Sequence, residues 1–302
     1  MLTLSIGIPA LNEAANIGHL LKALLTQSRG NFVLQNITVV SDGSTDATVA
    51  RAREVGDTHI VVVEHQDRKG QAARQDEIVR SCTSDLLLLM NADMLPKGDK
   101  FLETLVAPFY LDESLGLVSC KGTPLEAETK FEQIINFGVA FKESMVGSLN
   151  LGDNVYNCHG HTRIFARKFY ADFTFGGVVS EDAYSYFVCK QRGFSFRYVS
   201  IAKVMYRSPQ TLKDHLKQSV RFLQGQAQLA ALFGQRIVHT AHAIPRDVFV
   251  RVSVKHLIQS PILFTQYVLV NVIAMVVAKF KQYAMLTWDT ATSSKTLIKP
   301  KE

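Results

Sequence analysis

An α/β fold, with a mainly parallel sheet and helices on both of its faces, is the fold class that the sequence predicts. Through the first half of the 302-residue chain, short apolar runs alternate with segments of helical periodicity. The runs are apolar throughout and not only at every second residue, which is typical of strands buried on both faces. We predict strands at residues 4–8, 37–40, 60–63, 86–90 and 115–119.

The first helix is predicted from the spacing of its apolar residues. Side chains at i, i+3, i+4, i+7 and i+8 give this pattern: Ile17, Leu20, Leu21, Leu24 and Leu25. We expect Asn12 to cap the helix. A later helix is expected to begin after Ser180 and to end before Gly193.

A long helix is expected over residues 211–233, and its two faces differ in character. An apolar stripe is predicted on one face: Leu212, Leu216, Val220, Leu223, Ala227 and Ala231. Gln218, Arg221, Phe222 and Gly225 group on the opposite face. A solvated face would carry Lys and Glu, so this second face is interpreted as a contact surface. The planar donor fork of Arg221 suits a phosphate group.

Polar residues follow three of the predicted strands, at the edge where parallel sheets bind ligands. Pro9 to Glu13 follow the first strand, Asp42 follows the second, and Asn91 and Asp93 follow the fourth. Asp42 is suited to accept a hydrogen bond from a base or ribose, and Asp93 is a hard oxygen ligand for Mg²⁺ or Mn²⁺. Each group alone is equally typical of helix caps and turns.

Glu181 and Asp182 fall in the first turn of the helix that begins after Ser180. Carboxylates at this position stabilise a helix by interacting with its dipole. The alternative interpretation is functional, because a carboxylate held rigidly at a helix start is well placed to accept a proton. Both interpretations remain open at this point.

The charge balance divides the chain in two. Lysines and arginines number 33 and acidic residues 27, which gives a net charge of +6. Residues 1–244 carry 25 basic and 24 acidic side chains, whereas residues 245–302 carry 8 and 3. Because the main body is nearly neutral, we expect no nucleic-acid partner. The four cysteines are far apart, form no CxxC and fit free thiols in the cytoplasm. The first residues are interpreted as a buried strand and not as a signal peptide.

Residues 257–278 contain no formal charge and are flanked by Lys255, Lys279 and Lys281. The length is enough to cross a bilayer. Gln266 and Asn271 are costly at the centre of a membrane, so a helix at the membrane surface and a protein-buried helix pair are the alternatives. We expect the chain to be peripheral, or attached through this tail, at the inner face of the cell membrane.

Several segments, taken in order, resemble the family-2 nucleotide-sugar glycosyltransferases of the GT-A fold. The resemblance covers about residues 1–235. The segments are IPALNEAANIGHLLKAL, VVSDGSTDATVARA, KGQAARQ, LLLLMNADMLP, GHTRIFARK, FGGVVSEDAYSYFVCKQRG and QSVRFLQG. The implied organisation is a GT-A, Rossmann-like catalytic domain at residues 1–235 and a helical, basic and apolar tail at residues 236–302.

The resemblance implies a role for each matching residue. Pro9, Asn12, Glu13 and Asp42 would line the nucleotide pocket. Asn91 and Asp93 correspond to the ends of the family's DxD motif, with Asp93 as the ligand of Mg²⁺ or Mn²⁺. Asp182 of the Glu181–Asp182 pair would be the catalytic base. Gln218, Arg221 and Phe222 match the QxxRW motif, in which Arg221 faces the donor diphosphate.

The sequence departs from the family pattern at three places. Asn91 replaces an Asp, Phe222 replaces a Trp, and residues 205–207 read Met-Tyr-Arg where many relatives carry a His. A histidine metal ligand is therefore doubtful there, and Arg207 is a candidate source of positive charge. His159 and His161 are interpreted either as structural residues or as substitute ligands.

The resemblance implies an inverting, metal-dependent transfer of a sugar, with a UDP-linked sugar as the expected donor. The expected acceptor is a lipid-linked or polysaccharide-repeat hydroxyl at the cytoplasmic membrane face. Residues 131–149 form either part of the acceptor site or a core helix. A soluble small-molecule acceptor and a non-catalytic nucleotide-sugar binding module are the alternatives, and a homo-oligomer stays open. A nucleotidyltransferase is disfavoured, since no basic residue follows the first strand until Lys22.

Overall fold

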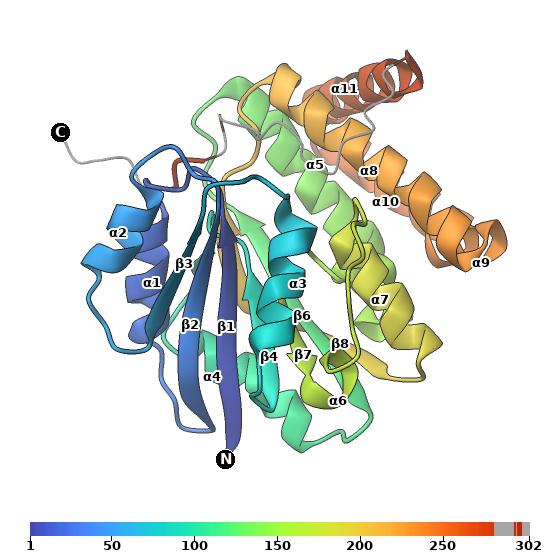
Figure 1. The fold of residues 1–302 in the computed structure, drawn as a ribbon. Helices are drawn as coiled ribbons and strands as arrows, with labels where there is room; N and C mark the ends of the chain where they lie inside the picture. The colour runs from blue at the N-terminus through green and yellow to red at the C-terminus, as the bar shows by residue number, and fades with distance from the viewer. Residues whose placement is uncertain (281–292, 294, 298–302) are drawn as a thin grey trace.

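A computed structural model describes residues 1–280, 293 and 295–297 of the chain (Figure 1). Within these residues, eight strands form one sheet in the order β3-β2-β1-β4-β7-β6-β8-β5. The strands are β1 (Leu2–Ala10), β2 (Phe32–Asp42), β3 (Ile60–His65), β4 (Leu86–Met90), β5 (Leu95–Pro96), β6 (Leu115–Pro124), β7 (Thr162–Ala166) and β8 (Ser195–Tyr206). All five predicted strands are confirmed.

The sheet is mixed, with a parallel half that contains the predicted alternation of strands and helices. Strands β3, β2, β1 and β4 pair in parallel, and so do β6 and β8. Strand β7 runs antiparallel to both β4 and β6, and the short β5 runs antiparallel to β8. The carboxyl ends of β1, β2, β4 and β8 therefore meet, together with the start of β7, at one edge of the sheet.

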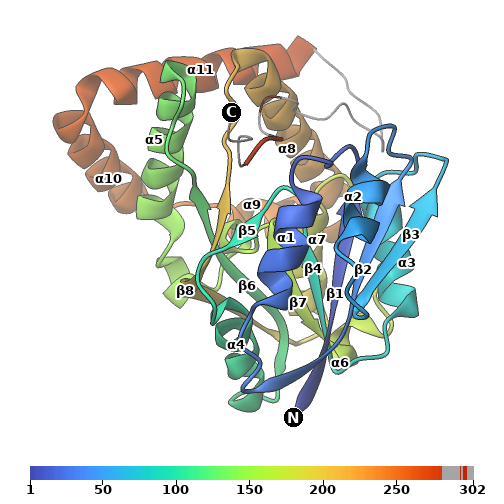
Figure 2. The same cartoon turned by 90° about the vertical axis from the view of Figure 1, so that its left-hand side faces the viewer.

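Helices cover both faces of the sheet, as predicted (Figures 1 and 2). The α-helices that pack around the sheet are α1 (Ile17–Leu25), α2 (Thr48–Glu54), α3 (Gln71–Ser81), α4 (Phe101–Val106), α6 (Arg167–Tyr170) and α7 (Glu181–Gln191). One face packs against α1, α2 and α4, and the other against α3, α6 and α7. Strand β4 contributes alternate side chains to the two cores, since Leu86 and Leu88 face one and Leu87 and Leu89 the other.

The remaining α-helices lie beyond the edge of the sheet. They are α5 (Lys130–Val146), α8 (Leu212–Phe233), α9 (Gln235–Ala241), α10 (Arg246–Gln259) and α11 (Pro261–Phe280). A third core joins α5 to α10 and α11 through Phe141, Val252 and Tyr267. Three single turns of 3₁₀-helix complete the described chain: η1 (Ala107–Tyr110), η2 (Leu149–Gly152) and η3 (Val155–Asn157). The apolar helix expected near residues 131–149 thus packs as a core helix against the C-terminal helices.

Two local predictions are wrong. Asn16, and not Asn12, occupies the N-cap position of α1, while Asn12 adopts a left-handed backbone conformation with φ of 54°. The uncharged residues 257–278 are divided between two helices, since α10 ends at Gln259 and Pro261 begins α11, which agrees with the helix pair that was one of the alternatives. Proline lacks an N–H and suits the first position of a helix.

The predicted apolar stripe on α8 is also wrong, since only Val220 of its members is buried. The residues of α8 that are buried are Asp214, Val220, Gly225 and Leu229. Helix α8 contacts different neighbours along its length, so no single stripe faces a core. Its first turn is as predicted, because the Thr211 side chain accepts a hydrogen bond from the amide of Asp214.

Candidate active site

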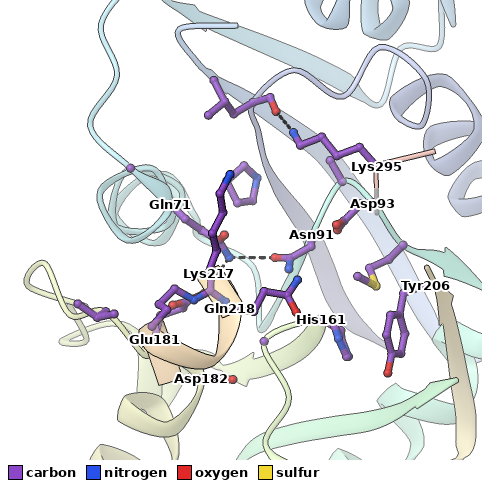
Figure 3. Close-up of a pocket in the computed structure, with 18 of the residues that line it drawn as sticks. Gln71, Asn91, Asp93, His161, Glu181, Asp182, Tyr206, Lys217, Gln218 and Lys295 are labelled. Carbon is purple, nitrogen blue, oxygen red and sulfur yellow. Dashed lines mark hydrogen bonds between the residues drawn. The ribbon is translucent and has the colours of Figure 1, made fainter. Parts of the chain in front are cut away.

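A cleft of about 400 Å³ lies at the edge of the sheet where β1, β2, β4 and β8 end. Residues from distant segments line it, which Figure 3 shows for Asn91, Asp93, Glu181, Asp182 and Gln218. The predicted site residues in its lining are Pro9, Glu13, Asp42, Asn91, Asp93, Glu181, Asp182, Gln218, Arg221 and Phe222. Asn12 is the exception and has a structural role. Its side-chain oxygen accepts a hydrogen bond from the amide of Thr45, which ties the β1–α1 loop to the loop after β2.

Glu13 is buried in the wall of the cleft, next to Asp93. Its carboxylate accepts a hydrogen bond from Asn16 Nδ2 at 2.9 Å and pairs with Lys295 Nζ at 2.7 Å. Burial, and to a lesser extent the charge of Asp93, raises the pKa of Glu13 to about 7, although Lys295 acts in the opposite direction. Lys295 thus provides the positive charge for a wall that is otherwise acidic.

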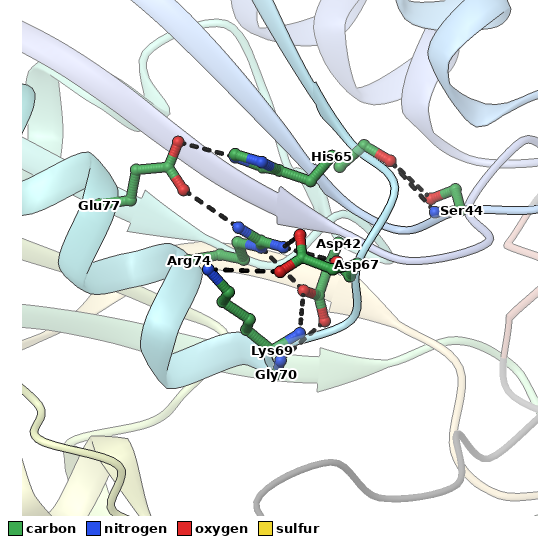
Figure 4. A network of polar contacts seen from close by, with 9 residues as sticks. Asp42, Ser44, His65, Asp67, Lys69, Gly70, Arg74 and Glu77 are labelled. Carbon is green, nitrogen blue, oxygen red and sulfur yellow. Dashed lines mark hydrogen bonds and ion pairs between the residues drawn. The ribbon is translucent and has the colours of Figure 1, made fainter.

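Asp42, which ends β2, is held by groups of the protein itself (Figure 4). Its Oδ1 accepts hydrogen bonds from the Lys69 amide and from Arg74 Nε, both at 2.8 Å, and its Oδ2 accepts one from the Gly70 amide at 2.9 Å. Arg74 also pairs with Asp67. A carboxylate has about four acceptor positions. One position of Asp42 therefore remains for a ligand, and its other contacts order the loop before α3.

Asn91 takes part in a chain of side-chain contacts that the sequence did not predict. Gln71 Nε2, at the start of α3, lies 2.9 Å from Asn91 Oδ1 and 2.9 Å from Glu181 Oε1. The backbone N–H of Asn91 also donates a hydrogen bond to the backbone carbonyl of His161. Gln71 therefore connects the end of β4 to the start of α7, and it lines the cleft itself.

Asp93 is the candidate metal ligand. Burial raises the pKa of its carboxyl group, and the charges of Lys295 and Arg221 act against that rise. No group of three or more His, Cys, Asp or Glu side chains that could hold a metal ion is found among the described residues. Mg²⁺ in nucleotide sites commonly takes one or two carboxylates and completes its shell with phosphate oxygens and water. A single hard carboxylate in a cleft of this size fits that mode of binding.

Glu181 and Asp182 occupy the first turn of α7, as predicted, and both line the cleft. Ser180 holds the N-cap position but makes no capping hydrogen bond. Burial, followed by the neighbouring Asp182, raises the pKa of Glu181. The fully buried Arg163 donates to the Glu181 carbonyl at 2.7 Å. This buried cation fixes the start of α7 beneath the two carboxylates.

Helix α8 places Gln218, Arg221 and Phe222 on the cleft. The Arg221 guanidinium lies over the Phe222 ring, 5.5 Å from its centroid. Gly225 allows α8 to approach α7, because a Cβ at this position would lie 1.8 Å from Ser180 Oγ. The close approach of the two helices at this point brings Arg221 and the Glu181–Asp182 pair to the same cleft.

Arg207 and His161 line the cleft with contacts that limit their roles. Arg207 pairs with Glu128 and Glu132, each at 3.0 Å, so its charge is already balanced. His161 stacks on Tyr206 with ring centroids 4.6 Å apart, and burial lowers its pKa to about 3. The imidazole is therefore neutral at physiological pH, and its ring packs as part of the wall.

The sequence model of the family described as Glycosyl transferase family 2 matches residues 5–173. This is more than half of the chain, and it contains the loops after β1, β2 and β4. The chain belongs to glycosyl transferase family 2. The fold of this family-2 protein agrees with the resemblance seen in its sequence. The start of α7 and the whole of α8 lie beyond the matched residues.

Curated relatives and solved structures are consistent with this membership. The chain is 32% identical over 152 residues to a 4,4'-diaponeurosporenoate glycosyltransferase of Staphylococcus aureus. The match covers 49% of this chain and 38% of that protein, so the chain spans about two fifths of the length of these relatives.

Two solved structures share the fold at low sequence identity. A mannosyltransferase from Pyrobaculum calidifontis, in complex with GDP-Man and Mn²⁺, gives a TM-score of 0.58 at 17% identity, over 93% of this chain and 76% of that one. Glucosyl-3-phosphoglycerate synthase from Mycobacterium tuberculosis, in complex with Mn²⁺, UDP and glucosyl-3-phosphoglycerate, gives a TM-score of 0.51 at 16% identity, over 76% of this chain and 79% of that one. Both support the assignment of the GT-A fold.

Proposed function

We propose that this protein transfers a sugar from a nucleotide-sugar donor to an acceptor hydroxyl, with inversion at the anomeric carbon. The observation that carries the proposal is the meeting of four groups on one cleft. Asp93 follows β4, Glu181 and Asp182 begin α7, and Arg221 lies on α8. A carboxylate for a metal, a carboxylate for a proton and a guanidinium for a diphosphate are the groups that this reaction needs.

Each group would act at a particular atom. Asp182 would take the proton of the acceptor hydroxyl as that oxygen attacks the sugar. Arg221 would hold the departing diphosphate, which its planar donor fork suits. Asp93 would hold Mg²⁺ or Mn²⁺, which when bound supplies positive charge to the diphosphate. Glu181, fixed by Gln71 and Arg163, would keep the start of α7 in place.

The donor base and ribose would lie along Pro9, Glu13 and Asp42. Asp42 lines the cleft and retains one acceptor position, and the surrounding loop is ordered by Arg74. We favour a uridine nucleotide, with a guanosine nucleotide as the alternative. The similar solved structures hold UDP in one case and GDP-Man in the other.

The acceptor would be a lipid-linked or polysaccharide-repeat hydroxyl at the cytoplasmic face of the membrane. Helix α11 is long and apolar enough to cross a membrane. It contacts α5 and α8, across which it runs in Figure 2, and it buries Tyr267, Val270 and Ala274, while Leu269, Val272, Met275 and Val276 are exposed. A helix that lies against the protein along its length suits the membrane surface better than a span. The four cysteines are free thiols, consistent with a reducing compartment.

A donor panel tests this function. The purified protein is incubated with UDP- and GDP-linked sugars and Mn²⁺, and release of the nucleoside diphosphate is followed with and without a membrane extract. We expect release with one donor class and transfer of label into the lipid fraction. Tight binding of a donor without release or transfer would instead favour a non-catalytic binding module. Transfer only to water-soluble acceptors would contradict the proposed membrane acceptor and would leave the proposed sugar transfer standing.

A further inference from the structure

The described residues near the C-terminus, 293 and 295–297, return to the cleft and are called the C-terminal strap. Lys295 Nζ pairs with Glu13 Oε1 at 2.7 Å and donates to the carbonyls of Leu11 and Asn12, the latter at 3.0 Å. An ammonium group has three N–H donors. All three are thus used on the β1–α1 loop, and Figure 3 shows Lys295 beside Asp93 in the wall of the cleft.

The backbone of the strap is held on the same side by Asn16. The Asn16 side-chain amide donates to the carbonyl of Lys295, and its oxygen accepts a hydrogen bond from the amide of Leu297 at 3.1 Å. Asn16 is 1% exposed and Leu297 is 7% exposed. Because the buried Asn16 side chain hydrogen-bonds to two backbone groups of the strap, it fixes the strap in one register against α1.

The other side of the strap contacts the region where β8 leads into α8. The carbonyl of Thr296 accepts a hydrogen bond from Arg207 Nε at 3.1 Å. The amide of Ser293 donates to Asp214 Oδ2 at 3.1 Å, and Ser293 Oγ accepts from the amide of Gln210 at 3.2 Å. The strap therefore crosses from the β1–α1 loop to the helix that carries Arg221.

The strap forms a wall of the cleft and does not fill it. With the strap in place the cleft measures about 400 Å³, which falls within the range of small-molecule sites. Lys295 lines this space together with Asp42, Asp93 and Arg221. Its ammonium also balances the Glu13 carboxylate, which would otherwise repel a diphosphate.

We propose that the C-terminal strap is a wall of the donor site and that Lys295 is its positioning residue, which closes the strap on the β1–α1 loop and neutralises Glu13. The proposal rests on the proposed function, since the ligand is a nucleoside diphosphate in both. It assigns part of donor binding to residues that lie more than 100 positions after the matched family segment.

The first test measures the binding of UDP and of GDP, each with Mn²⁺, by titration calorimetry. Lys295→Met should weaken binding of the preferred nucleotide about tenfold, because the strap loses its charged hydrogen bonds to the β1–α1 loop and the Glu13 carboxylate loses its balancing charge. Lys295→Arg should restore part of the affinity. Lys168→Met is the matched control, since Lys168 is exposed on α6 and does not line the cleft. Binding by Lys295→Met that equals or exceeds that of the wild type would overturn the proposal.

A double-mutant cycle separates this role from a general loss of stability. If Lys295 acts by balancing Glu13, Lys295→Met should cost about tenfold in the wild-type background and less than about threefold in Glu13→Gln. Equal losses of nucleotide affinity in both backgrounds would contradict the proposal that Lys295 acts by neutralising Glu13.

Hydrogen exchange tests the strap without any nucleotide. The amides of residues 11–17 should exchange faster in Lys295→Met than in the wild type or Lys168→Met. Unchanged protection would overturn the closing of the strap on this loop. If the wild type bound neither nucleotide, the proposed function would fail, whereas the exchange result would still decide the role of Lys295.

Discussion

Glu13 shows how burial changes the chemistry of a single residue in this cleft. Its pKa rises from an ordinary value of 4.5 to about 7, because burial and the nearby Asp93 disfavour the charged form. The folded protein therefore binds this proton more tightly than the unfolded chain. The resulting stabilisation is full below pH 4.5 and is lost as the pH rises through 7.

Glu13→Gln should therefore flatten part of the dependence of stability on pH. From this group alone, the free energy of unfolding of the wild type should fall by roughly 3 kcal/mol between pH 4.5 and 7. The measurement is denaturant unfolding at pH 5 and pH 7.5. Glu113→Gln, an exposed carboxylate before β6, is the control and should keep the wild-type profile. If the free energy of unfolding of Glu13→Gln depended on pH in the same way as that of the wild type, the raised pKa of Glu13 would be contradicted.

At the residue scale, the sequence predicted most of the cleft because polar side chains after parallel strands meet at one edge. It could not separate the two asparagines of the β1–α1 loop, since either one is a suitable cap for α1. Asn12 takes the left-handed position and Asn16 the cap position. Gln71 was missed because a glutamine at a helix start carries no signal of its own. Its role depends on the approach of α7, which the sequence does not specify.

At the scale of elements, the contact between α7 and α8 depends on a single glycine. A methyl group at residue 225 would lie 1.8 Å from Ser180 Oγ and 2.8 Å from Ser180 Cβ. Either helix would have to move, and Arg221 lies one turn away on α8. The geometry of the cleft is therefore linked to the packing of α7 against α8.

Gly225→Ala should lower the free energy of unfolding by about 1–3 kcal/mol and reduce donor binding. Ser180→Gly, added to the same chain, should recover part of both losses because it removes the clashing side chain. Gly18→Ala in α1 is the control, where a new Cβ would meet only the Arg51 carbonyl at 3.9 Å. That control should be neutral or slightly stabilising. A fully stable Gly225→Ala protein with wild-type binding would show that the contact is not tight.

The sequence predicted a helix or strand correctly where all of its apolar residues are buried for the same reason. Buried strands follow this rule because helices cover both faces of the sheet, and α1 follows it because it packs on one face of the sheet. Helix α8 does not, since it contacts the cleft, α7 and α11 at different points. The apolar pattern of residues 257–278 also could not reveal the break at Ser260 and Pro261, because both segments are apolar.

At the scale of the whole molecule, α11 exposes an apolar face on the side away from its buried residues Tyr267, Val270 and Ala274. Replacing Leu269, Val272 and Val276 by Gln should weaken binding to vesicles that contain phosphatidylglycerol by about tenfold or more, since apolar area is lost from the membrane contact. Thermal stability should change little, because these side chains are exposed. The measurement is co-sedimentation with vesicles at two salt concentrations.

The matched control replaces exposed apolar residues on the body of the protein. Leu111 is 81% exposed and Ile201 is 78% exposed, and their replacement by Gln should leave vesicle binding unchanged. Equal loss in both variants would mean that α11 is not the membrane contact. The C-terminal strap, like this face, is a property of the folded molecule, because it joins residues nearly 280 positions apart.

The most direct test of the whole account is the reaction of Asp182→Asn with its donor. We predict that this variant binds the nucleotide sugar and Mn²⁺ as tightly as the wild type, while the transfer rate falls about 10²–10⁴-fold. Asp172→Asn, which removes an exposed carboxylate outside the cleft, should retain the wild-type rate. Binding by calorimetry and single-turnover transfer of radiolabelled sugar give the two quantities separately. Transfer by Asp182→Asn at the wild-type rate would contradict the assignment of this cleft and its base.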